Sequence, residues 1–213
     1  MNCNNISKIN ITIIGYTLFV ALYFCRSLLD IDSHIWLDIT KTLPVLFLSI
    51  TTYISGVNKL LPTALLLSAL GDLAGEEGMF LWQISLFAAA HIFFIIYFIG
   101  RAKNSKQSQI LATIWAIVIV FFGCFVIGNI ENSIFKYACT AYMVIIGIMV
   151  GSTMFIESRF RWYYILAALL FAFSDSCIAW NKFVEHFSYA GITIMSTYFA
   201  AQGIFATLYL KEE

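Results

Sequence analysis

Eight apolar segments follow one another along the chain, and short polar connections separate them. A helix that crosses a bilayer needs about 20 mostly apolar residues, with a range of about 17–25. Segments of about this length lie at 9–26, 35–54, 60–76, 79–100, 110–128, 134–156, 162–182 and 188–210. The longest polar connection, RAKNSKQSQ at 101–109, is too short for a soluble domain. The pattern predicts an all-α, polytopic membrane protein with eight transmembrane helices, folded as a single integral membrane domain over residues 1–213.

Two of these segments are interrupted by an aspartate at a similar position. LLLSALGDLAGEEGMF contains Asp72, and ALLFAFSDSCIAWNKF contains Asp175; a Phe follows each aspartate after eight residues. The two aspartates are separated by about half the length of the chain. This match favours two parallel four-helix repeats related by an axis along the membrane normal. We expect the first four helices to superpose on the last four.

The composition supports the membrane class. The chain is 61% apolar and 11% charged, whereas a soluble domain is about 45–50% apolar and about 25% charged. The net charge is zero and no basic tract is present, so we expect no nucleic-acid partner. The five cysteines form no C-x-x-C pair, which argues against a disulfide framework or a thiolate metal site.

The basic residues indicate an orientation, because Lys and Arg are enriched on the cytoplasmic side of membrane proteins. With eight helices, the termini share one side with the second, fourth and sixth connections. Eight of the twelve basic residues fall on that side: Lys8, Lys59, Arg101, Lys103, Lys106, Arg159, Arg161 and Lys211. The opposite side has Arg26, Lys136 and Lys182. We therefore expect both termini in the cytoplasm, with the bacterial inner membrane as the host membrane.

A small set of polar side chains lies inside the apolar segments, where a charge costs at least about 2.5–3.5 kcal/mol. The set comprises Asp38, Lys41, Ser68, Asp72, Gln83, His91, Tyr142, Ser174, Asp175, Asn181, Tyr198 and Gln202. At about 1.5 Å per helical residue, the strongly polar members lie near the centre or in the outer half of the bilayer. We infer one polar cavity within the bundle, walled by aromatic and aliphatic side chains.

Structural interpretations exist for the same residues. Lys41 and Asp38 are three residues apart on one helix and could form a local ion pair. Asp72 and Asp175 could be hydrogen-bonding residues between helices. Glu76, at the outer rim, is expected to be solvated.

An ordered set of short motifs resembles the YhhN-like lysoplasmalogenase family. The motifs are K-x-L-P (41–44), S-x-x-G-D (68–72), F-x-x-A-H-x-x-x-x-x-Y (87–97), S-D (174–175), N-K-F (181–183) and T-Y-F-A-A-Q (197–202). The resemblance implies eight transmembrane helices and hydrolysis of the vinyl ether bond of lysoplasmalogens. The products would be a fatty aldehyde and glycerophosphocholine or glycerophosphoethanolamine. It also implies membrane carboxylates as catalytic groups, which here are Asp72 and Asp175.

Two carboxyl groups suit this chemistry. Protonation of the β-carbon of a vinyl ether generates an oxocarbenium ion, water adds to the α-carbon, and the hemiacetal collapses to aldehyde and alcohol. Glycosidases pass through similar cations and divide the work between an acid and a carboxylate. Desolvation and a neighbouring like charge both favour the protonated form of one carboxyl group. We prefer Asp175 as acid and Asp72 as base, while the residues alone leave the reverse order open.

The other candidate residues would support the reaction or bind the lipid substrate. Lys41 could hold a carboxylate ionised or meet the substrate phosphate, and His91 could carry protons. Orientation of water or of headgroup oxygens is expected of Tyr142, Tyr198 and Gln202. Ser174 and Asn181 complete the candidate set. We expect no cofactor and no metal, and we expect membrane lipids as the surroundings of the substrate.

Other classes of function remain open from the sequence. A proton-coupled small-molecule or lipid transporter is the main alternative, because proton relays also use intramembrane Asp, Lys and His residues. No helix has the Gly or Pro interruption expected of a transporter midplane site. A zinc hydrolase would need about three protein ligands, and His91 is the one histidine within an apolar segment. A structural or lipid-sensing protein is the third alternative.

Overall fold

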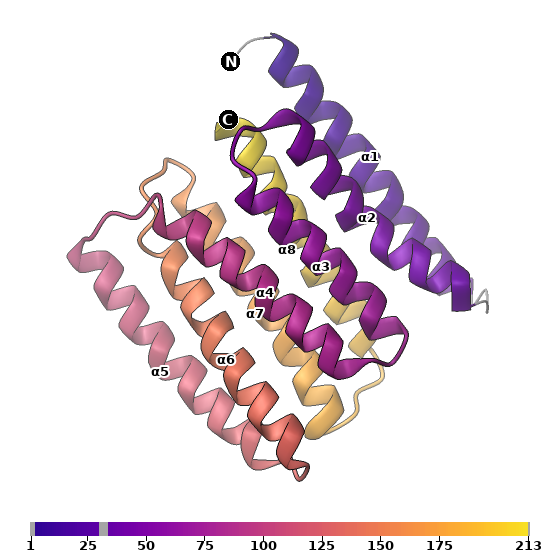
Figure 1. The fold of residues 1–213 in the computed structure, drawn as a ribbon, viewed down its shortest axis with the longest axis vertical. Helices are drawn as coiled ribbons and strands as arrows, with labels where there is room; N and C mark the ends of the chain where they lie inside the picture. Colours follow the sequence, from indigo (N-terminus) through magenta and orange to yellow (C-terminus); the bar gives the residue numbers. More distant parts are fainter. Residues whose placement is uncertain (1–2, 30–33, 213) are drawn as a thin grey trace. The chain divides into compact units, whose positions relative to one another are not determined.

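The computed structural model describes residues 3–29 and 34–212, with the side chains of residues 3–5 and 34–38 outside the description. In this part of the chain the eight predicted helices are present. They are α1 (Cys3–Leu28), α2 (His34–Ser55), α3 (Leu60–Glu76), α4 (Phe80–Ile99), α5 (Lys106–Gly128), α6 (Ser133–Thr153), α7 (Arg161–Phe183) and α8 (Ala190–Glu212) (Figure 1). Apart from the start of α1, each predicted boundary lies within four residues of the observed one. The all-α prediction is confirmed.

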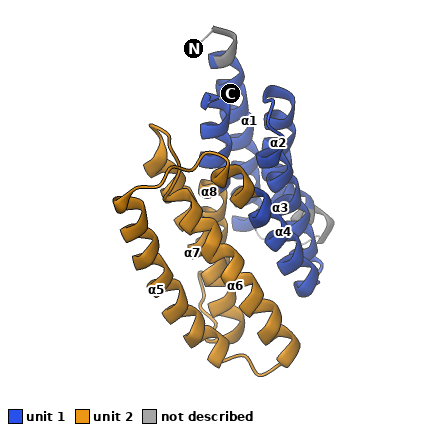
Figure 2. Cartoon of the chain, turned by 60° about the vertical axis from the view of Figure 1, so that its left-hand side comes forward, with its two compact units in different colours: residues 1–93, 202–213 blue, residues 94–201 orange. Residues whose placement is uncertain are grey.

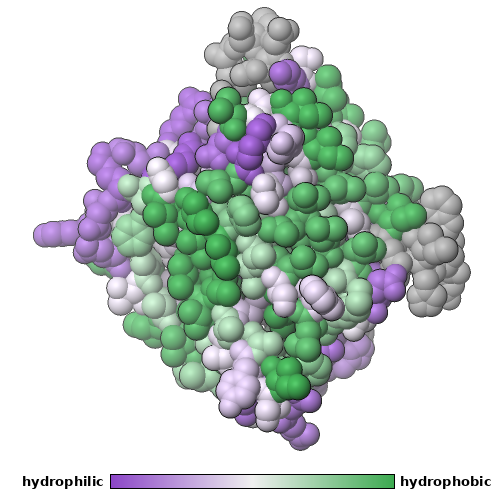
Figure 3. Space-filling view, viewed as in Figure 1, coloured by the Kyte–Doolittle hydropathy of each residue, from purple (hydrophilic) through white to green (hydrophobic). Residues whose placement is uncertain are grey.

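Six of the helices are long and apolar enough to cross a membrane. They are α1, within Ile6–Leu28, and α4, α5, α6, α7 and α8. The apolar stretch Ile39–Ser55 of α2 is shorter, and α3 has 17 residues, at the lower end of the spanning range of about 17–25. Large apolar side chains are exposed on the outer faces, for example Ile117 and Phe121 of α5. Figure 3 shows hydrophobic surface over most of one face, with hydrophilic residues gathered near helix ends. The chain is a multi-pass membrane protein.

The chain divides into two compact units (Figure 2). Unit 1 comprises residues 1–93 and 202–213, and thus contains α1, α2, α3, the first part of α4 and the end of α8. In this unit α2 packs against both α1 and α3. The Ser49 hydroxyl donates to the Pro62 carbonyl at 2.8 Å between α2 and α3. The buried Tyr209 of α8 donates to the Asn58 carbonyl at 2.5 Å, which anchors the α2–α3 loop.

Unit 2 comprises residues 94–201, from the end of α4 to the main part of α8. Here α6 packs against α5 and α7, and α5 also contacts α7. Its core is aromatic: the ring of Phe171 on α7 meets Phe94 of α4 edge-on at 6.4 Å and Tyr198 of α8 at 5.4 Å. Such edge-to-face pairs contribute about 0.5–1.5 kcal/mol beyond area burial. Ser105 caps the N-terminus of α5, and Asn132 caps that of α6, so each turn before a helix fixes its start.

The boundary between the units falls inside α4 and α8. The single integral membrane domain over residues 1–213 and the two four-helix repeats stay predictions of the sequence.

Candidate functional site

Asp72 lies on α3 inside unit 1 and is almost completely buried, with 3% of its surface exposed. The glycine before it brings α3 close to α4, because a Cβ atom at Gly71 would come within 3.1 Å of the Phe87 ring. Two tyrosines of α1, Tyr16 and Tyr23, lie within electrostatic reach of the Asp72 carboxyl group. The carboxyl group of Asp72 is therefore buried within electrostatic reach of two phenol side chains.

Lys41 of α2 forms an ion pair with Glu76 of α3, with 2.5 Å between Nζ and Oε1. The side chains are 13% and 18% exposed, so both charges are largely withdrawn from solvent. The expectation that Glu76 is solvated at the outer rim was therefore wrong. The lysine is long enough to reach the last turn of the neighbouring helix, and a charge near a bilayer is stabilised by such a partner. The predicted alternative partner, Asp38, has its side chain outside the described residues.

Gln202 of α8 is fully buried in unit 1. Within the described part of the chain, neither its amide nitrogen nor its amide oxygen has a hydrogen-bond partner. Leaving such a group unsatisfied costs about 1–3 kcal/mol, so the buried amide of Gln202 is a candidate binding group. The next residue, Gly203, lies close to the ring of Tyr16. A Cβ atom added at Gly203 would be 2.7 Å from that ring. His91 of α4 is also fully buried in unit 1.

The second intramembrane aspartate, Asp175 of α7, lies in unit 2 and is partly buried. The hydroxyl group of Tyr142 on α6 donates a hydrogen bond to its carboxylate. Two cysteines, Cys139 and Cys177, lie within electrostatic reach of the tyrosine and the aspartate respectively. We call Tyr142 and Asp175 the unit 2 pair. A carboxylate that accepts from a phenol hydroxyl has a charge-assisted, directional hydrogen bond.

Three further candidate residues of unit 2 make contacts that organise the fold. Ser174 donates to the Ile194 carbonyl at 3.0 Å and so ties α7 to α8. Asn181 accepts from the backbone N–H of Phe187 at 3.2 Å and holds the loop after α7. Tyr198 packs edge-on against Phe171, as described above. Participation of these three residues in substrate binding stays a prediction.

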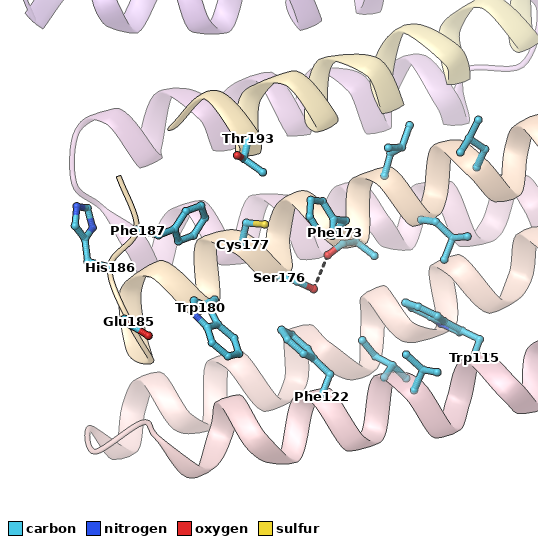
Figure 4. Close-up of a pocket in the computed structure, with 16 residues that line it drawn as sticks. Trp115, Phe122, Phe173, Ser176, Cys177, Trp180, Glu185, His186, Phe187 and Thr193 are labelled. Carbon is cyan, nitrogen blue, oxygen red and sulfur yellow. Dashed lines mark hydrogen bonds between the residues drawn. The ribbon is translucent and has the colours of Figure 1, made fainter. Parts of the chain in front are cut away.

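An apolar groove of about 960 Å³ runs along α7 in unit 2, between α5 and the start of α8 (Figure 4). Its walls include Trp115 and Phe122 of α5, and Phe173 and Trp180 of α7. Volumes of about 300–1,000 Å³ and largely apolar walls are typical of small-molecule sites. Sequence reasoning missed these residues, because an aromatic side chain on an apolar helix carries no polar signal.

The candidate residues thus fall into two groups. Unit 1 contains Lys41, Asp72, His91 and Gln202, and unit 2 contains Tyr142, Ser174, Asp175, Asn181 and Tyr198. The unit 2 pair and the Lys41–Glu76 pair are contacts that the sequence did not specify. The single polar cavity shared by Asp72 and Asp175 stays a prediction.

Comparison with known proteins identifies relatives over most of the chain. The YhhN family profile matches residues 36–208. Lysoplasmalogenase TMEM86B of Sus scrofa is 30% identical over 85% of this chain and 79% of its own length. Lysoplasmalogenase TMEM86A of Bos taurus is 28% identical over 82% of this chain and 79% of its own, and the Homo sapiens TMEM86B over 88% and 81%. No solved structure matches. The resemblance found in the motifs is confirmed, and this chain belongs to the YhhN family.

Proposed function

We propose that this chain is a lysoplasmalogenase, which hydrolyses the vinyl ether bond of lysoplasmalogens to a fatty aldehyde and glycerophosphocholine or glycerophosphoethanolamine. The observation that supports this most directly is the similarity to proteins of that name, at 28–30% identity over about four fifths of their length. These relatives give the transporter alternative no support. The lipid substrate also fits a chain whose outer helix faces are apolar.

We further propose that both intramembrane aspartates are required for the reaction. One carboxylic acid protonates the β-carbon of the alkenyl chain. The other, as a carboxylate, stabilises the oxocarbenium ion and accepts a proton from the water that attacks the α-carbon. The hemiacetal then releases the aldehyde, and its proton passes to the glycerol oxygen. Asp175 accepts a hydrogen bond from Tyr142, which suits the carboxylate role. Asp72 is then the proton donor, which reverses the order preferred from the sequence.

Two residues of unit 1 have supporting roles in this proposal. Lys41 forms an ion pair with Glu76, and in this proposal it fixes a negative charge near the end of α3. Gln202 offers a buried amide with a free donor and a free acceptor. Such a group can orient the attacking water or a hydroxyl of the glycerol backbone, because it can bind both the hydrogen and the oxygen of that group.

The orientation in the membrane is also a proposal. The distribution of basic residues supports a cytoplasmic position for both termini and for the α2–α3, α4–α5 and α6–α7 connections. The ends of α3 and α7 then lie on the outer side. The host membrane is proposed to be the bacterial inner membrane.

The test is an assay of purified protein with choline and ethanolamine lysoplasmalogens, in which fatty aldehyde is measured. Saturated alkyl ether and acyl lysophospholipids are the controls. We expect aldehyde from the vinyl ethers alone, with one equivalent of the glycerophospho product. In ¹⁸O-labelled water the glycerophospho product should stay unlabelled, because the broken bond joins the ether oxygen to the α-carbon. Flux of lipid in proteoliposomes without hydrolysis, or fatty acid release from the acyl lipid, would contradict the proposal.

A further inference from the structure

The groove of unit 2 has a carboxylate and an imidazole at one end. Glu185 and His186, in the loop after α7, lie at that end, and Trp115 lies toward the other (Figure 4). Between them the wall is formed mainly by apolar side chains such as Leu169 and Phe173, with the hydroxyl groups of Ser176 and Thr193 among them. A groove with one polar mouth and one long apolar wall matches the outline of an amphiphile with a single chain.

The polar mouth is held in place by the end of α7. The backbone N–H of Glu185 donates to the Trp180 carbonyl at 3.0 Å, and Asn181 accepts from the N–H of Phe187 at 3.2 Å. These bonds fix the loop that carries Glu185, His186 and Phe187 relative to the indole of Trp180. The mouth is therefore built on a helix end with two anchoring hydrogen bonds.

Aromatic rings surround the mouth. The Trp180 indole stacks with Phe125 at 5.5 Å and with Phe122 at 6.5 Å, with 19° between the ring planes in both pairs. Phe187 lines the same end of the groove. Aromatic faces attract quaternary and primary ammonium groups, and Trp is the strongest of them. A carboxylate beside such rings strengthens the attraction for an ammonium group, and the exposed Glu185 provides this carboxylate.

The length of the groove fits one hydrocarbon chain. From Trp180 to Leu166, two wall residues of α7, the helix extends about 21 Å at about 1.5 Å per residue. One leaflet accounts for about half of the roughly 30 Å hydrocarbon core, so a membrane lipid chain can lie along this wall. Cys177 lies in the same wall and within electrostatic reach of Asp175. A chain in the groove therefore passes the turn of α7 to which Asp175 belongs.

We propose that this groove binds a single-chain zwitterionic phospholipid. Its ammonium group lies at Trp180, Phe187 and Glu185, its phosphate lies near the imidazole of His186, and its chain extends along α7 toward Trp115. The choice of a lysophospholipid as the occupant rests on the proposed function, while the recognition of an ammonium group rests on the mouth itself. The mouth thus selects choline and ethanolamine headgroups over headgroups without a cation.

The experiment measures binding of saturated alkyl ether lysolipids to the full chain, because these analogues are not cleaved. The panel has phosphocholine, phosphoethanolamine and plain phosphate headgroups. We expect the phosphocholine lipid to bind most tightly and the plain phosphate lipid most weakly. Trp180→Ala should weaken phosphocholine binding roughly three- to thirtyfold. Glu185→Gln should weaken binding of both ammonium lipids and leave the phosphate lipid unchanged or bound more tightly.

Two matched variants control for general effects. Trp162→Ala removes an exposed indole of α7 outside the groove, and Glu131→Gln neutralises an exposed carboxylate in the α5–α6 connection. Neither should change binding. Equal affinity for all three headgroups, or wild-type binding by both Trp180→Ala and Glu185→Gln, would overturn the proposal. Because the ligands are not hydrolysed, headgroup-selective binding without aldehyde release from lysoplasmalogens would contradict the enzymatic proposal and leave the groove site standing.

Discussion

The phenol hydroxyl of Tyr142 on α6 donates a hydrogen bond to the carboxylate of Asp175 on α7. The two side chains come from neighbouring helices of unit 2, which pack directly against each other. The bond holds the carboxylate in one orientation and supplies a donor that does not depend on bulk water. A hydrogen bond to a charged group contributes about 1.5–3 kcal/mol, enough to hold the carboxylate of Asp175 in position.

Tyr142→Phe removes this donor while keeping the ring. If Asp175 acts as the carboxylate, we expect aldehyde release to fall by roughly 10- to 100-fold, because the carboxylate loses its orientation. The measurement is kcat/KM with a lysoplasmalogen in detergent. Tyr137→Phe, at an exposed position of the same helix, is the matched control. Equal activity of the two variants would show that the hydrogen bond has no catalytic role.

The Lys41–Glu76 pair predicts a strong coupling in stability. Lys41→Met or Glu76→Gln alone leaves one charge in a largely buried setting, so each should lower the free energy of unfolding by about 1–3 kcal/mol. The double variant should lose less than the sum of the two losses. The exposed pair Lys103–Glu157, at 67% and 63% exposure, is the control, with an expected coupling of about 0–1 kcal/mol. Additive losses at Lys41 and Glu76 would mean that the two charges do not stabilise each other.

The helices were predictable because a single property, apolar length, defines a transmembrane segment. The boundary at Lys106 shows where this fails: polar residues 106–109 continue α5 because Ser105 caps it. Propensity and capping extend a helix beyond its apolar part, so its polar start was read as a connection.

The contacts between candidate residues were less predictable, because they depend on how each helix is rotated. Lys41 lies near the start of α2 and Glu76 at the end of α3, two helices joined by a short loop, and this was the signal that could have paired them. Sequence spacing instead offered Asp38, three residues before Lys41 on the same helix, as an alternative partner. The packing of Tyr16 against Gly203, next to Gln202, joins distant parts of the chain. No local pattern specifies such a contact.

Gly56 provides a test of packing in unit 1. A Cβ atom at this position would collide with the phenol end of Tyr209, which is buried and bonded to Asn58. Gly56→Ala should therefore displace the tyrosine and lower the free energy of unfolding by about 1–3 kcal/mol. Gly191→Ala is the control, because nothing lies within 4 Å of its Cβ position; it should be neutral or stabilise α8 by up to about 1 kcal/mol. Thermal unfolding in detergent measures both, and equal unfolding temperatures would contradict the packing argument.

The distribution of basic residues makes a prediction about topology. A fluorescent protein fused to the C-terminus should fluoresce, because it stays in the cytoplasm, and alkaline phosphatase fused there should be inactive. Alkaline phosphatase inserted in the α5–α6 connection at 129–132 should be active, because that connection itself contains no Lys or Arg and lies on the side with few basic residues. The opposite pattern of activities would reverse the orientation and place the groove mouth of unit 2 on the cytoplasmic side.

The two-carboxylate hypothesis makes the sharpest prediction. Asp72→Asn and Asp175→Asn are nearly isosteric, but an amide neither protonates carbon nor stabilises a cation as an anion does. Each variant should lose about 10²–10⁴-fold in aldehyde release, with unchanged helix content by circular dichroism. Glu77→Gln, at an exposed position just after α3, is the control and should keep full activity.

Because the two aspartates act as one unit in this mechanism, the variant with both substitutions should be no slower than the slower single variant. If one single variant keeps substantial activity, its aspartate is not required, and the reaction needs a different proton donor or anion. Glu76 would then be the first group to test, because it lies one helical turn from Asp72 and is paired with Lys41.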